Sequence, residues 1–64
     1  MNLTDKYLRI IKPIGDILPA DIIVWCLIDH DEDGFRVRTM QDYHGVREIW
    51  LSTERRDSIE IYWR

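Results

Sequence analysis

The chain has 64 residues, a formal net charge of −3 and 45% hydrophobic residues. These values are ordinary for a globular domain and argue against wholesale disorder. A chain of this length buries only about 60% of its unfolded surface, so a thin stability margin is expected. The single cysteine excludes an internal disulfide framework, and no Cys/His cluster suits a structural zinc ion. We therefore expect one domain over residues 1–64 that is held together by packing.

No segment is predicted to cross a membrane or to direct secretion. The longest apolar run, Ile22–Ile28, is far shorter than the roughly 20 residues of a membrane helix. The first residues lack a basic stretch followed by an apolar core. With a lone thiol and no signal, we expect a cytoplasmic protein that does not bind membranes.

The N-terminal third is predicted to form one strand and one ordered loop. Tyr7–Ile11 fits a strand, although the apolar spacing of residues 3–11 also fits a helix capped by Thr4. We favour the strand because four later strands need a fifth to close a barrel. Pro13 ends either element. In the loop that follows, three apolar residues are expected to cover the core, namely Ile14, Ile17 and Leu18.

A β-hairpin is the strongest local signal. Residues 22–29 are rich in β-branched and aromatic residues, residues 30–34 end in Asp-Gly, and residues 35–40 alternate in polarity. Gly34 supplies the positive φ that such a turn requires. The first strand is apolar on both faces, so either it is covered twice or one face meets a partner. We expect one face to carry Ile22, Val24, Cys26 and Ile28, and the other Ile23, Trp25 and Leu27.

Two further strands are predicted after this hairpin. Asp42–Gly45 reads as a turn that leads into a strand over Val46–Leu51. Residues 52–57 are polar and fit one helical turn, with Ser52 or Thr53 at its N-cap. Residues 58–63 alternate again, which places Ile59, Ile61 and Trp63 on one side and Glu60 and Tyr62 on the other.

This order of elements resembles the Src-homology-3-like small barrels, which include Tudor-type and ribosomal KOW-type domains. Residues 15–24 look like the loop that leads into the second strand of that class, and residues 46–52 look like its fourth strand running into a short helical turn. The resemblance implies an all-β, five-stranded barrel with a short helical turn before the last strand. The motifs of the proline-peptide groove and of the KOW loop are missing, so no site residue is carried over.

Acidic residues at the hairpin turn match the opening of a calcium loop. The pattern is Asp29-x-Asp31-x-Asp33-Gly34, but Met40 occupies the position that needs a bidentate glutamate, and the flanks read as strands. We interpret the segment as a solvated acidic tip that serves as a binding surface.

Catalysis and metal binding are not expected. Cys26 lies within an apolar strand, where a free thiol behaves as a small hydrophobe. His30 and His44 lie in turns, and no third ligand has suitable spacing for a metal. So small a fold offers no evident oxyanion hole or substrate pocket. We therefore predict neither an enzyme nor a bound cofactor.

Aromatic residues are frequent, with three Trp, three Tyr and one Phe. A 64-residue barrel has room inside for about two large rings, so some of Trp25, Trp50 and Tyr62 are expected to face outward. Exposed aromatics beside arginines are typical of interaction hot spots. The charge is also uneven, because residues 1–33 carry three basic and seven acidic side chains (net −4) and residues 34–64 carry six arginines and five acidic side chains (net +1).

These features favour a non-catalytic module that binds another protein, and a phage or mobile-element protein that blocks a host protein is one form of this hypothesis. A homodimer is a further expectation. The alternative is a Tudor- or KOW-like nucleic-acid binder that uses Arg36, Arg38 and Arg47 with exposed aromatics, although the acidic chain argues against it. The partner-binding residues expected from the sequence are Trp25, Trp50, Tyr62, Tyr43, Arg36, Arg38, Asp29, Asp31, Glu32 and Asp33.

Overall fold

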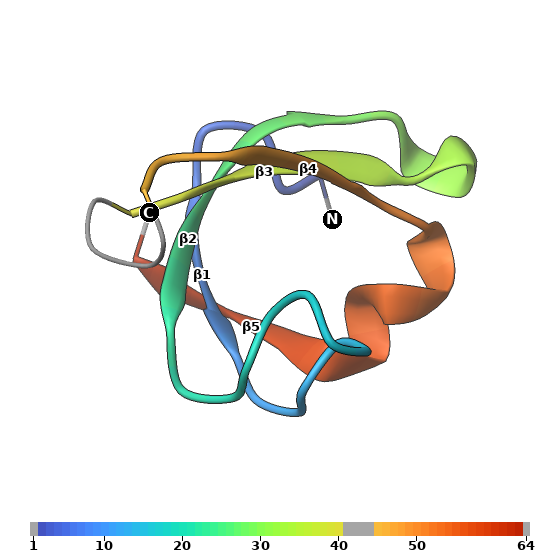
Figure 1. The fold of residues 1–64 in the computed structure, drawn as a ribbon. Coiled ribbons are helices and arrows are strands. Elements are labelled where there is room, and N and C mark those ends of the chain that lie inside the picture. Colours follow the sequence, from blue (N-terminus) through green and yellow to red (C-terminus); the bar gives the residue numbers. More distant parts are fainter. Residues whose placement is uncertain (1, 41–44, 64) are drawn as a thin grey trace.

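The computed structural model describes residues 2–40 and 45–63. It contains five strands that form one antiparallel sheet in the order β4-β3-β2-β1-β5 (Figure 1). Short 3-10 turns follow β2 and β4. The elements are β1 (Tyr7–Ile10), β2 (Ile23–Asp29), η1 (Asp31–Asp33), β3 (Phe35–Thr39), β4 (Glu48–Leu51), η2 (Thr53–Ser58) and β5 (Ile59–Trp63).

The all-β, five-stranded prediction is confirmed, including the N-terminal strand and the helical turn before the last strand. The predicted closure into a barrel is wrong. Among the residues that the structure describes, β4 pairs only with β3 and β5 pairs only with β1. Figure 1 shows β4 above the interior and β5 below it, with η2 joining them at one end. The sheet is therefore curved but open between its two edge strands.

Alternation in β3 places its side chains as expected. Phe35, Val37 and Thr39 are buried, whereas Arg36 and Arg38 face solvent. Phe35 is the largest fully buried side chain, and the described tryptophans Trp25 and Trp50 lie outside the core. The buried hydrophobic residues are Leu3, Leu8, Ile10, Ile14, Leu18, Val24, Cys26, Phe35, Val37 and Leu51.

A register shift in β2 overturns the predicted faces of this strand. Val24 and Cys26 are buried as expected, but the pairing with β3 shifts between Cys26 and Ile28. A bulge of one residue exchanges the two faces of the strand beyond it. Ile28 is therefore 42% exposed, and Asp29 is buried at 6% exposure.

The loop between β1 and β2 covers one end of the interior. Ile14 and Leu18 are buried there and exchange backbone hydrogen bonds. Ile17, expected beside them, is instead 45% exposed, because residues 14–18 form a tight turn whose middle faces solvent. No helix in the described part of the chain is long and apolar enough to cross a membrane.

Candidate interaction surface

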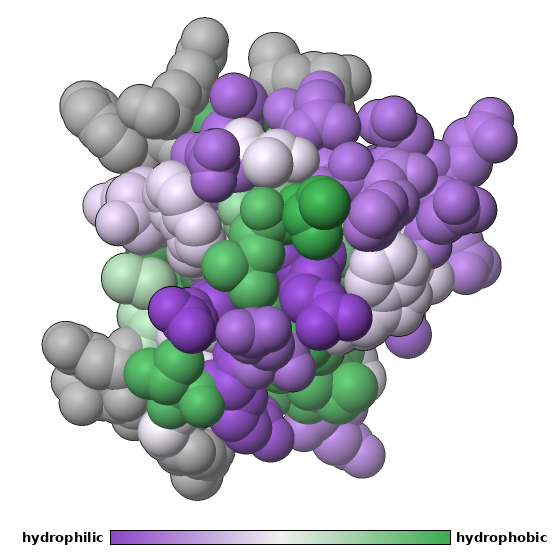
Figure 2. All heavy atoms as spheres, turned by 90° about the horizontal axis from the view of Figure 1, so that it is seen from above, coloured by the Kyte–Doolittle hydropathy of each residue, from purple (hydrophilic) through white to green (hydrophobic). Residues whose placement is uncertain are grey.

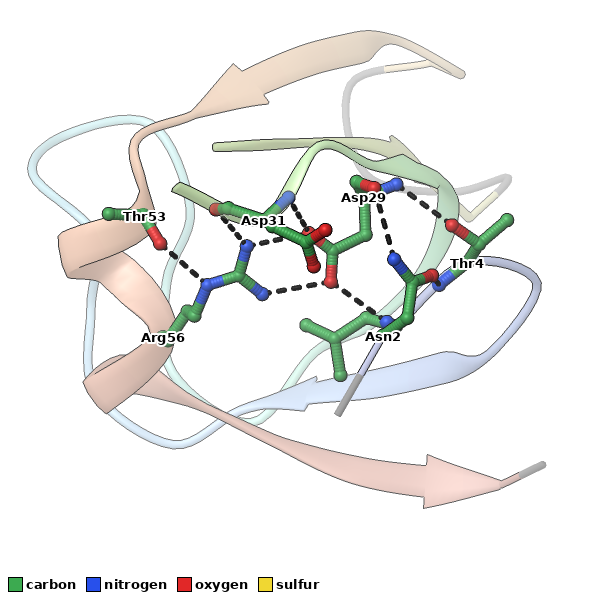
Figure 3. A network of polar contacts seen from close by, with 7 residues as sticks. Asn2, Thr4, Asp29, Asp31, Thr53 and Arg56 are labelled. Atoms are coloured by element: carbon green, nitrogen blue, oxygen red, sulfur yellow. Dashed lines mark hydrogen bonds and ion pairs between the residues drawn. The ribbon is translucent and has the colours of Figure 1, made fainter. Parts of the chain in front are cut away.

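The buried carboxylate of Asp29 organises one end of the sheet (Figure 3). It forms two ion-paired hydrogen bonds with Arg56 from η2, with N–O distances of 2.6 and 2.9 Å. It also accepts hydrogen bonds from the backbone N–H groups of Leu3 and Asp31, both at 2.8 Å. Asp29 therefore ties the N-terminal segment, the hairpin tip and η2 together. It is a structural residue, and its predicted place on an exposed acidic surface is wrong.

Arg56 makes four hydrogen bonds in this network. Its Nε donates to the Thr53 hydroxyl at 2.7 Å, and one terminal nitrogen donates to the Asp31 carbonyl at 2.7 Å. The guanidinium also lies over the Phe35 ring, 4.8 Å from its centroid. The bonds from Arg56 hold the pKa of Asp29 at about 2, well below its usual range, and burial acts in the opposite direction.

Two rows of side chains cross the sheet on its solvent side. In the first row, Ile28, Arg36 and Trp50 occupy paired positions on β2, β3 and β4. In the second row, Trp25, Arg38 and Glu48 are paired in the same way. We call this set the outer face, and it consists of Trp25, Ile28, Arg36, Arg38, Glu48 and Trp50.

Aromatic contacts hold the rings of the outer face in place. Trp25 packs edge-on against Tyr7 of β1, with ring centroids 4.6 Å apart. Trp50 is 46% exposed, and the centroid of its ring lies 5.7 Å from the centroid of the His30 ring. Trp50 also covers Gly34, where a Cβ would meet both the Trp50 ring and the Leu51 carbonyl. With its φ of 112°, Gly34 confirms the predicted glycine turn, and its missing side chain leaves room for Trp50.

The charges on the outer face are only partly balanced. Arg36 and Arg38 share the single carboxylate of Glu48, at N–O distances of 3.7 and 3.4 Å. In contrast, Arg9 has two carboxylate partners, Asp21 and Glu60. Figure 2, which looks down on the molecule from above, shows apolar side chains gathered in small groups among hydrophilic ones. A mixed surface of this kind is typical of interaction sites, where apolar anchors are surrounded by polar groups.

The remaining residues expected at the site lie elsewhere. Asp31, Glu32 and Asp33 are exposed on η1, and a shallow depression between η1 and η2 is lined by Asp31, Glu32, Thr53 and Arg56. Tyr62 is 59% exposed on β5, at the opposite edge of the sheet from β4. Tyr43 lies outside the described residues.

The sequence reasoning missed the outward position of Ile28 and the Arg56 network. The apolar character of both faces of residues 22–28 was the available signal for Ile28, but a bulge has no signature in that pattern.

No group of three or more His, Cys, Asp or Glu side chains within the described ranges is placed to hold a metal ion. Cys26 is buried, and burial raises the pKa of its thiol to about 11, with the Asp29 charge acting in the same direction. Comparisons with protein-family models, with curated proteins and with solved structures gave no match to this chain.

Proposed function

We propose that this chain is a non-catalytic module that binds another protein through the outer face. The observation that carries the proposal is the juxtaposition of Ile28, Arg36 and Trp50 in one transverse row. Trp and Arg are the residues most enriched at binding hot spots, and an exposed ring held by its neighbours loses little entropy on binding. One form of this proposal is that the chain is a phage or mobile-element protein that binds a host protein and thereby blocks it.

Protein is favoured over nucleic acid as the partner because of the charges around the arginines. Glu48 lies between Arg36 and Arg38, and the whole chain carries a net charge of −3. Nucleic-acid binding rests on a surplus of positive charge that releases counterions from phosphates. A partner with a few acidic groups around an apolar centre suits the outer face better.

We also propose that the fold belongs to the Src-homology-3-like layout. The strand order and the 3-10 turn between β4 and β5 support this proposal. In the described part of the chain β4 and β5 do not pair with each other, and this distinguishes the fold from a closed barrel.

Affinity capture with matched variants tests the proposed function. The immobilised chain is compared with Trp50→Ala, which truncates the outer face, and with Tyr62→Ala, which truncates an exposed ring on β5. We expect a protein to be retained stoichiometrically by the original chain and by Tyr62→Ala, and lost by Trp50→Ala. Retention that is equal for all three chains, or absent for all, would overturn the proposal.

Salt dependence separates the two classes of partner. A complex built on six phosphate contacts weakens about 10³-fold between low and moderate salt, whereas an apolar protein interface changes little. Binding of a nucleic acid in a gel-shift assay at low salt, lost at moderate salt, would favour the alternative function.

A further inference from the structure

Strand β4 (Glu48–Leu51) is an unpaired edge. It has one ladder neighbour, β3, and no other strand in the described part of the chain pairs with its second side. Edge strands of soluble proteins are commonly protected by proline, lysine or a bulge. β4 has the sequence Glu-Ile-Trp-Leu and contains no proline, lysine or bulge; its short length and the charged Glu48 are its only protections of this kind.

The register shows which backbone groups face this open side. The Thr39 N–H donates to the Arg47 carbonyl at 2.8 Å, so Thr39 and Arg47 form a hydrogen-bonded pair. Such pairs alternate with non-hydrogen-bonded pairs along an antiparallel ladder. Arg38–Glu48 and Arg36–Trp50 are therefore non-hydrogen-bonded pairs. The N–H and C=O groups of Glu48 and Trp50 consequently point away from β3.

The side chains of β4 are also incompletely covered. Ile49 packs against the core but stays half-buried, and Trp50 is exposed on the other face. A strand added beside β4 would satisfy the free backbone groups and cover both side chains at once.

We infer that β4 pairs antiparallel with β4 of a second copy of this chain, around a two-fold axis at Trp50. In this register the two Trp50 residues exchange both backbone hydrogen bonds, Ile49 lies opposite Leu51, and Glu48 lies opposite Ser52. The apolar side chains on the interior side, Ile49 and Leu51, thus lie opposite each other. The free backbone N–H groups of each strand donate to free C=O groups of the other. The two Trp50 rings lie side by side on the outer side.

Charge complementarity selects a second copy as the occupant. In the same register, Arg47 of one chain lies next to the start of η2 of the other chain, where Thr53 is followed by Glu54. Arg47 and Glu54 are both exposed, and neither makes an ion pair with another described residue. Two opposite-charge contacts of this kind, one at each end of the paired strands, favour this register.

The inference concerns the backbone edge of β4, although Glu48 and Trp50 of this strand also belong to the outer face. N-methylation of Trp50 removes only a backbone donor, so its effect on dimerisation is distinguished from the Trp50→Ala truncation that tests the proposed function. The consequence of dimerisation for that function is geometric. Pairing through β4 joins two five-stranded sheets into one and brings two outer faces side by side, so that a dimeric partner would be bound at two sites with increased avidity.

Removal of one backbone donor tests the pairing. The 64-residue chain is short enough for chemical synthesis, and N-methylation of Trp50 deletes the donor that faces the open edge without changing any side chain. N-methylation of Ile61 is the matched control, because the Ile11–Ser58 hydrogen bond places the Ile61 N–H on the open side of β5. Circular dichroism checks that each chain folds.

Sedimentation velocity from about 1 to about 500 µM measures the assembly. We expect the unmodified chain and N-methyl-Ile61 to approach twice the 7.8 kDa mass of one chain with rising concentration. N-methyl-Trp50 should raise the dimer dissociation constant at least about 10-fold, because both central hydrogen bonds are lost. A chain that stays monomeric throughout, or an N-methyl-Trp50 chain that dimerises as well as the original, would refute the inference.

A charge exchange provides a second test that does not use β4 itself. Arg47→Glu should weaken dimerisation, and the double variant Arg47→Glu/Glu54→Arg should restore it, because the exchanged charges meet again across the axis. Failure of the double variant to restore the dimer would exclude the Trp50-centred register. Loss of dimer only on N-methylation of Ile61 would place the interface at β5 and contradict the inference.

Discussion

Replacing Asp29 by asparagine should destabilise the fold strongly. The substitution keeps the shape of the side chain but removes the charge that pairs with Arg56 at 2.6 and 2.9 Å. Breaking a buried pair from one side costs about 3–5 kcal/mol. We expect the lower end of that range, about 3 kcal/mol, because the Arg56 side chain is partly exposed and keeps Thr53 and the Asp31 carbonyl as partners.

The pKa of Asp29 leads to a similar magnitude. Its value of about 2 in the folded chain lies below the ordinary 3.8, and this difference corresponds to about 2 kcal/mol of stability at neutral pH. Because the folded pKa is the lower one, this stability is fully present above pH 3.8 and is lost as the pH falls through about 2. A domain of this size has a total stability of about 3–10 kcal/mol, so Asp29→Asn removes a large share.

Urea unfolding followed by tryptophan fluorescence measures this effect. The free energy of unfolding is compared for the original chain, Asp29→Asn and the control Asp31→Asn between pH 7 and pH 2. Asp31 is exposed with a φ of 56°, a conformation that asparagine tolerates well, so the control should change stability by less than about 0.5 kcal/mol. A gap between the original chain and Asp29→Asn below about 0.5 kcal/mol at pH 7 would refute the assigned role, as would a gap that stays constant down to pH 2.

Three other predictions concern single side chains. Gly34→Ala should cost at least about 2 kcal/mol in urea unfolding, because φ is 112° and the added Cβ meets Leu51 and Trp50; an unchanged midpoint would contradict this. The Cys26 thiol, with its pKa of about 11 and no exposure, should react with a thiol reagent at pH 8 only in urea, and rapid labelling of the folded chain would show otherwise. Glu48→Gln should change stability by less than about 0.5 kcal/mol, because its ion pairs are exposed; a larger loss at low salt would reveal a stronger network.

Local patterns in the sequence were sufficient to predict most elements of this protein, although the pattern of residues 3–11 fitted both a helix and the strand β1. Strict alternation over residues 35–39 and the Asp33-Gly34 pair define β3 and its turn, because side-chain period and backbone φ are properties of neighbouring residues. The same reasoning located η2 and β5 to within about one residue. The outward positions of Arg36 and Arg38 also followed from alternation in β3. For Trp50, the limited room in a small core indicated only that some of Trp25, Trp50 and Tyr62 face outward.

Only the tertiary structure determined which residues face inward near the end of β2 and what holds that end together. A shift of one residue in the β2–β3 pairing turns Ile28 outward and Asp29 inward, and a pattern along one strand contains no information on such a shift. Arg56 reaches Asp29 from 27 positions away, a distance at which sequence spacing predicts no contact. The open edge of β4 depends in the same way on where β5 lies in space, because strand pairing joins segments that are far apart in the chain.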